Sequence, residues 1–505
     1  MVAGILIALS LWPLWSGMVV INDDLKFVRS PACDLPVGDH LRQMWASQSF
    51  RPLEVLVGRT CDAETLRCTL VIPIQAIGFA MICWAVSMLA RIILPTDHRL
   101  APLAMILVAL SPATTTALWQ MDTCSQTWGV AFGLWSCVIA WHGFREAESG
   151  RWPWVHGLLL AGGFVVSGLI KETAYGWSFS IGLCALCGIA VLLRQSRTAP
   201  LRMLPILLGL VMIPPLLLLV RLGAGALGHE RGDGLDNPYK LDIGLNLPMN
   251  ALMVTIGAAA TGPFHLITNG DAPLVLRALP GLACVLVGLL GVTAFEFGFL
   301  RGGREERSAC RLAVLLLLAT SGSAAITCLM QSVGDLYCFG LNVGFALLTA
   351  LAVLLILRAC DAEQCVRAVG VAARLAFAMT LAIGAFGLCG RAAHFRTTWM
   401  TASRTNAAII QAADAWVAKE AARGTTLAPG DQLDICFGPA CRPGSTYGQY
   451  ICSVLQAIDW NLSARWMLRR DPKLRLGVHT DLDCTLFPGN VFTVDCPANL
   501  SYGKW

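Results

Sequence analysis

Four short polar groups interrupt an otherwise apolar chain, and each places ionisable side chains at or near the end of an apolar run. They read Asn22-Asp23-Asp24-Leu25-Lys26, Ser49-Phe50-Arg51-Pro52-Leu53, Trp119-Gln120-Met121-Asp122 and Lys171-Glu172-Thr173. A positioned carboxylate can take the proton of a hydroxyl group as a general base. An arginine presents a planar, permanently charged fork that fits a pair of phosphate oxygens. The residue types therefore indicate chemistry between a hydroxyl group and a phosphorylated partner.

The candidate base is one of two adjacent carboxylates, Asp23 and Asp24, which follow the first apolar run. Neighbouring carboxylates at a helix end point in different directions, so one can face a cavity while the other caps or pairs. Their spacing does not decide which is the base. Asp122 has no cation in its own short loop, so its partner must come from another segment. Structural alternatives stay open: the first pair would mark a helix end, and Asp122 would cap the next helix.

Arg51, Lys171 and Arg221 are the candidate phosphate-binding residues. Arg51 directly precedes Pro52, which would fix the start of a surface helix, and lipid headgroups are its alternative partner. Lys171 lies at the outer end of an apolar run, where membrane topology does not call for a positive charge. A bound phosphate would give a reason for that lysine. The possible supporting residues are Lys26, Glu172, Tyr239, Lys240 and His265.

The overall composition is that of a polytopic helical membrane protein. The chain has 505 residues, is 56% hydrophobic and 14% charged, and has a mean hydropathy of +0.64. Soluble domains carry roughly 25% charged residues, so this composition excludes a water-soluble enzyme, a disordered chain and a nucleic-acid-binding protein. The net charge of +5 is too small to indicate an electrostatic partner.

The apolar runs predict about eleven transmembrane helices, because a bilayer core of roughly 30 Å needs about 20 apolar residues per helix. The runs lie near residues 2–21, 71–94, 101–118, 125–143, 155–170, 173–193, 203–222, 274–300, 311–330, 336–357 and 370–390. A further segment, 248–262, is apolar but short, and we interpret it as a partly inserted or interfacial helix.

The arginines predict the orientation of these helices. Alternate loops contain Arg91 and Arg99, Arg145 and Arg151, Arg194 to Arg202, Arg301 to Arg311, and Arg358 to Arg374. The short loops 119–124 and 331–335 contain no Lys or Arg. Positive charge favours the cytoplasmic side, so the N-terminus is expected in the cytoplasm and the C-terminus outside. All four polar groups then fall on the outside face, where they could form a single site.

Two domains are expected. Residues 1–390 would form a transmembrane catalytic domain that includes the outside loops 22–70, with interfacial helices, and 223–273. Residues 391–505 would form a small extracytoplasmic α/β domain. Its pattern predicts helices at 401–422 and 447–469 and strands at 432–437, 474–479 and 490–495.

These motifs, in this order, resemble the GT-C superfamily of integral-membrane glycosyltransferases, which take sugars from polyprenyl-phosphate carriers. The resemblance covers roughly the first 270 residues and does not extend to the C-terminal segment. It implies an inverting reaction with Asp23 or Asp24 as the base and a functional role for Asp122. It also implies that Arg51 and Lys171 hold the donor phosphate. The carrier-phosphate branch generally needs no metal or other cofactor, although a divalent metal is not excluded.

The expected function is transfer of one monosaccharide from a polyprenyl-phosphate donor to an acceptor glycan, lipid or protein. A phosphate leaving group departs as a stable anion and needs positive charge rather than a general acid. The acceptor hydroxyl needs one carboxylate on the opposite face of the sugar. An arginine-rich, lysine-poor composition favours a bacterial source, and thus glycan biosynthesis at the cell envelope with the C-terminal domain in the periplasm. Membrane lipids are the other expected partners.

Two other functions remain open. An O-antigen-type polymerase or ligase would use a pyrophosphate-linked donor, and several arginines in a large outside loop would suit it. A transporter or lipid flippase would show internal repeats and interrupted helices. No repeat is evident, and the charged groups gather on one face, which favours a reaction over transport.

Overall fold

The structure is a computed structural model of the whole chain, and its described residues are mostly helical. They comprise residues 10, 36–46, 53, 56–57, 59–60, 70–119, 123–171, 173–194, 199–211, 244, 246–259, 274–325, 328, 335–363, 365–394, 411, 414–416, 418–424, 432–437, 475–479 and 491–494. The predicted first span, 2–21, and the predicted second half of span 203–222 lie almost wholly outside these residues.

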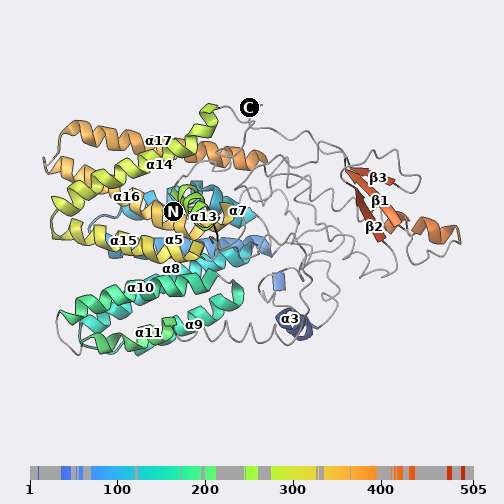
Figure 1. Cartoon of the computed structure of the whole chain (residues 1–505), viewed down its shortest axis with the longest axis horizontal. Helices are drawn as coiled ribbons and strands as arrows, with labels where there is room; N and C mark the ends of the chain where they lie inside the picture. Colours follow the sequence, from blue (N-terminus) through green and yellow to red (C-terminus); the bar gives the residue numbers. More distant parts are fainter. Residues whose placement is uncertain are drawn as a thin grey trace.

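Within the described residues, six helices are long and apolar enough to cross a membrane, and a bent pair may be counted as a seventh. The six are α5 (Val71–Ile93), α10 (Thr173–Leu193), α14 (Leu274–Ala294) with its π-helical continuation η5 (Phe295–Leu300), α15 (Arg304–Ala325), α16 (Phe339–Asp361) and α17 (Arg367–His394). Figure 1 shows them side by side as a bundle. The chain is thus a helical protein of membrane type.

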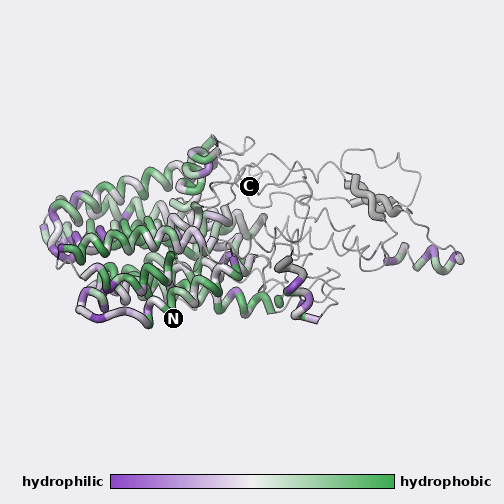
Figure 2. Tube along the Cα trace, turned by 60° about the horizontal axis from the view of Figure 1, so that its bottom comes forward, coloured by the Kyte–Doolittle hydropathy of each residue, from purple (hydrophilic) through white to green (hydrophobic). Residues whose placement is uncertain are grey.

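Three further helices pack in the same bundle at predicted spans. They are α8 (Cys124–Glu148), α9 (Trp154–Ile170), and α11 (Leu204–Val211) after the 3-10 turn η3 (Ala199–Met203). In Figure 2 apolar residues run along the bundle and hydrophilic residues gather toward the ends of the helices. Helix α16 is the centre, since 83% of its most apolar window is buried, against 28% for the α14–η5 span.

The predicted span 101–118 is broken in the structure. Helix α6 (Leu100–Leu110) and helix α7 (Pro112–Trp119) meet at an angle of 66°. Pro112 has no backbone N–H and disfavours a helical residue before it, so Ser111 is extended, with φ −70° and ψ 132°. Proline is well suited to the first position of a helix, and α7 begins there. The whole of α7 is buried.

Helix α13 (Asn246–Ala259), which corresponds to the apolar segment 248–262, runs across the bundle rather than along it. The Asn250 side chain donates to the carbonyl of Cys328, just beyond α15, at 3.3 Å. The Asn342 side chain, in the first turn of α16, donates to the carbonyl of Ala258 at 2.7 Å. Cys328 and Asn342, the two partners of α13, lie at the same end of the bundle. Asn250 and Ala258, which they contact, are about 12 Å apart along α13, so the axis of α13 runs across that end. An orientation across the bundle agrees with a helix that does not cross the membrane.

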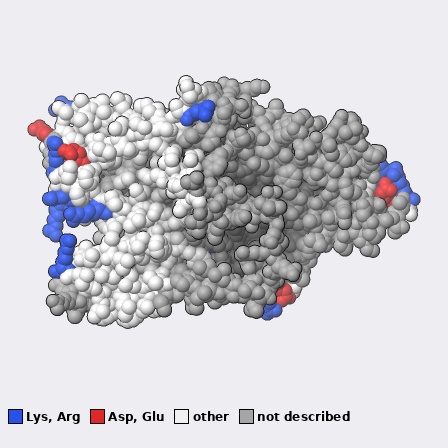
Figure 3. All heavy atoms as spheres, in the orientation of Figure 1, with Lys and Arg blue, Asp and Glu red and all other residues white. Residues whose placement is uncertain are grey.

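Most of the described arginines of the bundle lie at one end, on the left of Figure 3, although Arg277 at the start of α14 lies at the other end. We call the end on the left the arginine-rich end, and it holds the loops 94–99, 149–153, 301–303 and 362–366. Ion pairs join these loops. Asp97 accepts two hydrogen bonds from the Arg99 guanidinium, at 2.9 and 2.8 Å, and Arg358 lies 3.6 Å from it. Hydrogen bonding from Arg99 lowers the pKa of the Asp97 carboxyl below its ordinary value.

Three short strands lie apart from the bundle, toward the right of Figure 1. They are β1 (Gln432–Phe437), β2 (Arg475–His479) and β3 (Val491–Val494), and they form a parallel sheet in the order β2-β1-β3. Their positions agree with the three predicted strands. Residues 414–416 and 418–422 are helical within the predicted helix 401–422, and the predicted helix 447–469 lies outside the described residues.

One of the expected surface helices in the loop 22–70 is present as α3 (Val37–Ala46). Arg42 and Asp39 form an ion pair at 3.0 Å on its exposed side, and Leu41 is half-buried. The helix is therefore amphipathic, as the sequence around His40 predicts.

Candidate functional site

Of the predicted site residues, Lys171 lies within the described part of the chain. The others lie outside it, so their positions relative to Lys171 stay predictions; they are Asp23, Asp24, Lys26, Arg51, Asp122, Glu172, Arg221, Tyr239, Lys240 and His265. The candidate site is therefore built from Lys171 and the described residues around it.

Lys171 joins α9 to α10 at the end of the bundle opposite the arginine-rich end. Its backbone is extended, with φ −149° and ψ 138°, so the two helices form a tight hairpin. Its N–H donates to the Ser167 carbonyl at 2.7 Å, and its own carbonyl accepts from Ala174 at 3.2 Å. The residue is only 8% exposed. An ionisable side chain buried at the end of a membrane span is a functional candidate by default.

The buried position of Lys171 depends on a glycine of α8. A Cβ added at Gly129 would lie 3.4 Å from the Lys171 Cβ and 3.3 Å from the Thr173 Oγ1. The absence of a side chain therefore lets the lysine stem pass close to the α8 backbone. Lys171, Thr173 and the start of α8 thus form one packed unit.

The start of α8 is polar on two faces. On the face toward α5 and α7, one carbonyl accepts three hydrogen bonds: Ala117 O is 2.9 Å from Gln75 Nε2, 2.8 Å from Thr123 Oγ1 and 3.3 Å from Thr127 Oγ1. The last carbonyls of a helix have no partner within it, and Ala117 lies in the final turn of α7. These side chains supply that partner and fix α5, α7 and α8 relative to one another.

The other polar face of α8 has unmet hydrogen-bonding capacity. Gln126 is fully buried, and neither its Oε1 nor its Nε2 forms a hydrogen bond. It lies three residues after Thr123 and three before Gly129, so it lies on α8 between the face toward α7 and the face that meets Lys171 and Thr173. The Thr173 hydroxyl, also buried, is without a partner as well. An unmet buried polar group costs roughly 1–3 kcal/mol, so Gln126 and Thr173 indicate a site prepared for a polar ligand.

Tight helix packing closes this site on the side toward the middle of the bundle. Trp177 is buried against Gly133 of α8, and its indole is one turn of α10 beyond Thr173. Gly176 and Gly322 bring the backbones of α10 and α15 into direct contact. Small residues allow such close approach between membrane helices. We call Gln126, Gly129, Lys171, Thr173 and Trp177 the Lys171 site.

No group of three or more His, Cys, Asp or Glu side chains that could hold a metal ion occurs within the described residues. The Lys171 site itself offers N–H donors from an ammonium and an amide and an O–H donor from a hydroxyl, which suit an anion or a sugar hydroxyl group.

Sequence reasoning identified Lys171 but missed Gln126. The available signal was the run Thr123, Ser125, Gln126 and Thr127 at the start of an apolar span. Polar residues at a span end are ordinary, however, and only the packing of α8 on the α9–α10 hairpin distinguishes Gln126 from its neighbours.

Comparisons with protein-family models, with curated proteins and with solved structures found no match to this chain.

Proposed function

We propose that the protein is an inverting membrane glycosyltransferase that moves one monosaccharide from a polyprenyl-phosphate donor to an acceptor glycan, lipid or protein. The observation that carries the proposal is the buried Lys171, packed with Thr173 against Gly129 of α8 and one helical turn from the buried Gln126, at the end of the bundle opposite the arginine-rich end. A phosphate carried on a lipid reaches such a position from the membrane. Its oxygens would accept hydrogen bonds from the ammonium, the amide and the hydroxyl.

The chemistry follows from these groups together with the predicted carboxylates. Lys171 would stabilise the negative charge that develops on the departing phosphate, with Arg51 and Arg221 as predicted additional cations. Asp23 or Asp24 would take the proton of the acceptor hydroxyl on the opposite side of the sugar, and Asp122 would assist. One bond forms between acceptor oxygen and anomeric carbon, and the bond from that carbon to the phosphate oxygen breaks.

The proposal includes a topology. Eleven crossings place the N-terminus and the arginine-rich end in the cytoplasm, and the Lys171 site and the C-terminal α/β domain outside, in a bacterial inner membrane. The arrangement of the described helices supports this topology. Each described loop that joins two consecutive helices and contains an arginine lies at the same end of the bundle, and positive charge favours the cytoplasmic side.

The test uses purified full-length protein and a panel of radiolabelled polyprenyl-phosphate sugars, assayed for transfer and hydrolysis. Asp23→Asn and Asp24→Asn are tested separately. We expect one of them to abolish transfer while donor binding is retained. Full activity in both variants would overturn the base assignment. Use of pyrophosphate-linked donors alone would instead favour the polymerase or ligase.

A transporter is the second candidate, and the break between α6 and α7 favours it. Discontinuous helices often form the substrate site of transporters, and Thr114, Thr115 and Thr116 just after the break are buried. Proteoliposomes that translocate a lipid-linked sugar without cleaving it would support this function over the transferase.

A further inference from the structure

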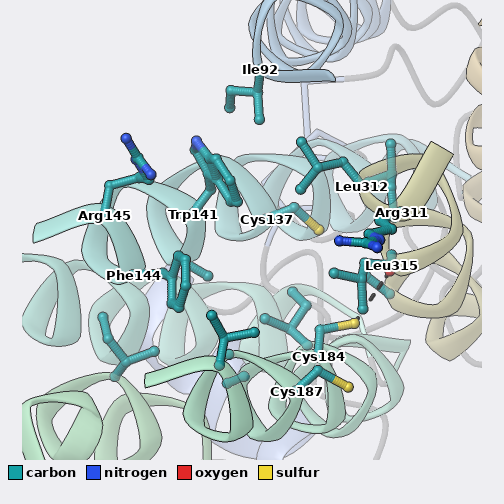
Figure 4. A pocket seen from close by; sticks show the side chains of 18 of the residues that line it. Ile92, Cys137, Trp141, Phe144, Arg145, Cys184, Cys187, Arg311, Leu312 and Leu315 are labelled. Carbon is teal, nitrogen blue, oxygen red and sulfur yellow. Dashed lines mark hydrogen bonds between the residues drawn. The ribbon is translucent and has the colours of Figure 1, made fainter. Parts of the chain in front are cut away.

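A cavity of about 340 Å³ lies in the half of the bundle nearer the arginine-rich end, away from the Lys171 site. Its walls come from the last turns of α5, the second halves of α8 and α10, the first two-thirds of α15, the end of η3 and the start of α11. Figure 4 shows the side chains that line it, among them Ile92, Trp141, Phe144, Leu312 and Leu315. Most of the lining is apolar, and the volume is in the range of ligand pockets, roughly 300–1,000 Å³.

The cavity has one uncompensated charge. Its ionisable lining residues other than cysteines are Arg145, Glu148 and Arg311. Arg145 forms an ion pair with Glu148 and lies over the Trp141 ring, 6.0 Å from its centroid. Arg311 contacts the Phe299 ring at 5.6 Å, and no carboxylate among the described residues forms an ion pair with it. The net charge of the lining is thus positive and resides on Arg311.

Arg311 lies within α15 rather than in the loop before it, and part of the residue is exposed. It is seven residues after Arg304, the first residue of α15, and therefore about 10 Å into the helix. Figure 4 shows its guanidinium directed into the cavity, toward Cys137. An arginine beside the apolar side chains of membrane helices is expensive unless an anion or water accompanies it.

We infer that this cavity binds an anionic phospholipid from the leaflet at the arginine-rich end. An acyl chain fills the apolar space between α8, α10 and α15, and the phosphate pairs with Arg311. The apolar walls and the single positive charge match the two parts of such a lipid, and basic pockets between helices are known to bind anionic headgroups. The inference is independent of the proposed transfer reaction, since the two sites lie in opposite halves of the bundle.

The inference is tested by cross-linking the full-length protein in lipid nanodiscs. The probes are phospholipids with a photoreactive acyl chain and either a phosphoglycerol or a phosphocholine headgroup, and the cross-linked residues are mapped by mass spectrometry. We expect the phosphoglycerol probe to label the cavity segments 137–148 and 311–319 about five-fold more than the phosphocholine probe. Arg311→Gln should remove that preference.

A matched control is Arg307→Gln, which removes the same charge from an α15 arginine that is also exposed but does not line the cavity. It should leave the preference unchanged. Cys137→Phe, which fills the space that Arg311 faces, should lower labelling by both probes. Equal labelling by both probes in the wild-type protein would overturn the inference, as would equal losses in the two arginine variants or preferential labelling by a photoreactive polyprenyl phosphate.

Discussion

The two ends of the bundle satisfy their polar groups in opposite ways. At the arginine-rich end several loop charges form ion pairs with one another: Arg358 bonds Thr96 at 2.7 Å and lies 3.7 Å from Glu305. At the other end Lys171 and Gln126 are buried, and the Gln126 amide is without a hydrogen bond. Exposed ion pairs contribute little to folding, whereas unmet buried groups oppose it.

We interpret this difference as separating loops that ion pairs hold together from the end that would carry the proposed transfer reaction. Groups that cost stability persist where they serve binding or catalysis, and pairs that join loops serve the fold. Substitutions at the Lys171 site should therefore affect activity more than stability. Substitutions at the arginine-rich end should affect stability more than activity.

The largest expected effect is that of Lys171→Met. The variant keeps the length of the stem beside Gly129 but removes the charge that would face the donor phosphate. We expect transfer activity to fall by about 100-fold or more, measured with the donor found in the panel assay. Lys419→Met, at an exposed lysine in the segment after α17, is the control and should retain full activity. Unchanged activity in Lys171→Met would remove the lysine from the proposed mechanism.

Gly129→Val tests the packing that positions Lys171. The added side chain would press on the lysine stem and on Thr173, and overpacking of this kind costs about 1–3 kcal/mol. We expect a lower melting temperature in detergent together with reduced activity. Gly162→Val is the matched control, because nothing lies within 4 Å of a Cβ at that glycine. Equal destabilisation by both variants would show only the general effect of valine in these helices.

A pair of glutamine variants compares a buried amide that donates a hydrogen bond, that of Gln75 in α5, with one that does not, that of Gln126 in α8. Gln75→Leu removes the donor to Ala117 O and should lower stability by about 1 kcal/mol. Gln126→Leu removes an amide that has no partner, so stability should be unchanged or higher while activity falls. Thermal unfolding and transfer assays of both variants check this. A loss of stability in Gln126→Leu without a loss of activity would make Gln126 structural.

Much of the bundle could be predicted from the sequence because apolar runs and arginine-containing loops report directly on membrane spans. The predicted limits of 173–193 agree with α10, and the strand at 432–437 agrees with β1. The break at Ser111 was not predicted, although Pro112 is visible in the sequence, because a proline inside an apolar run can also leave a membrane helix intact.

The site was predicted only in part, for a different reason. Lys171 is conspicuous because a charge is rare beside an apolar run. Gln126 becomes significant only when α8 meets the α9–α10 hairpin, which no local pattern reports. The same holds for Arg311: its sequence position suggests a loop charge, whereas the structure places it about two turns inside α15 and facing a cavity.

The smallest effect is expected at the arginine-rich end, from Asp97→Asn. The Asp97 pKa is lowered in the folded protein, so this carboxylate contributes stability above the ordinary aspartate pKa of about 4. That contribution is lost as the pH falls through the lower folded pKa. Arg99 is largely exposed, so the ion pair contributes about 1 kcal/mol or less. Melting temperatures measured from pH 7 to pH 3 should fall more steeply for the wild-type protein than for Asp97→Asn, with transfer activity at pH 7 equal in both. A large loss of activity in Asp97→Asn would contradict the division between the two ends, because it would couple the loop ion pairs to the distant Lys171 site.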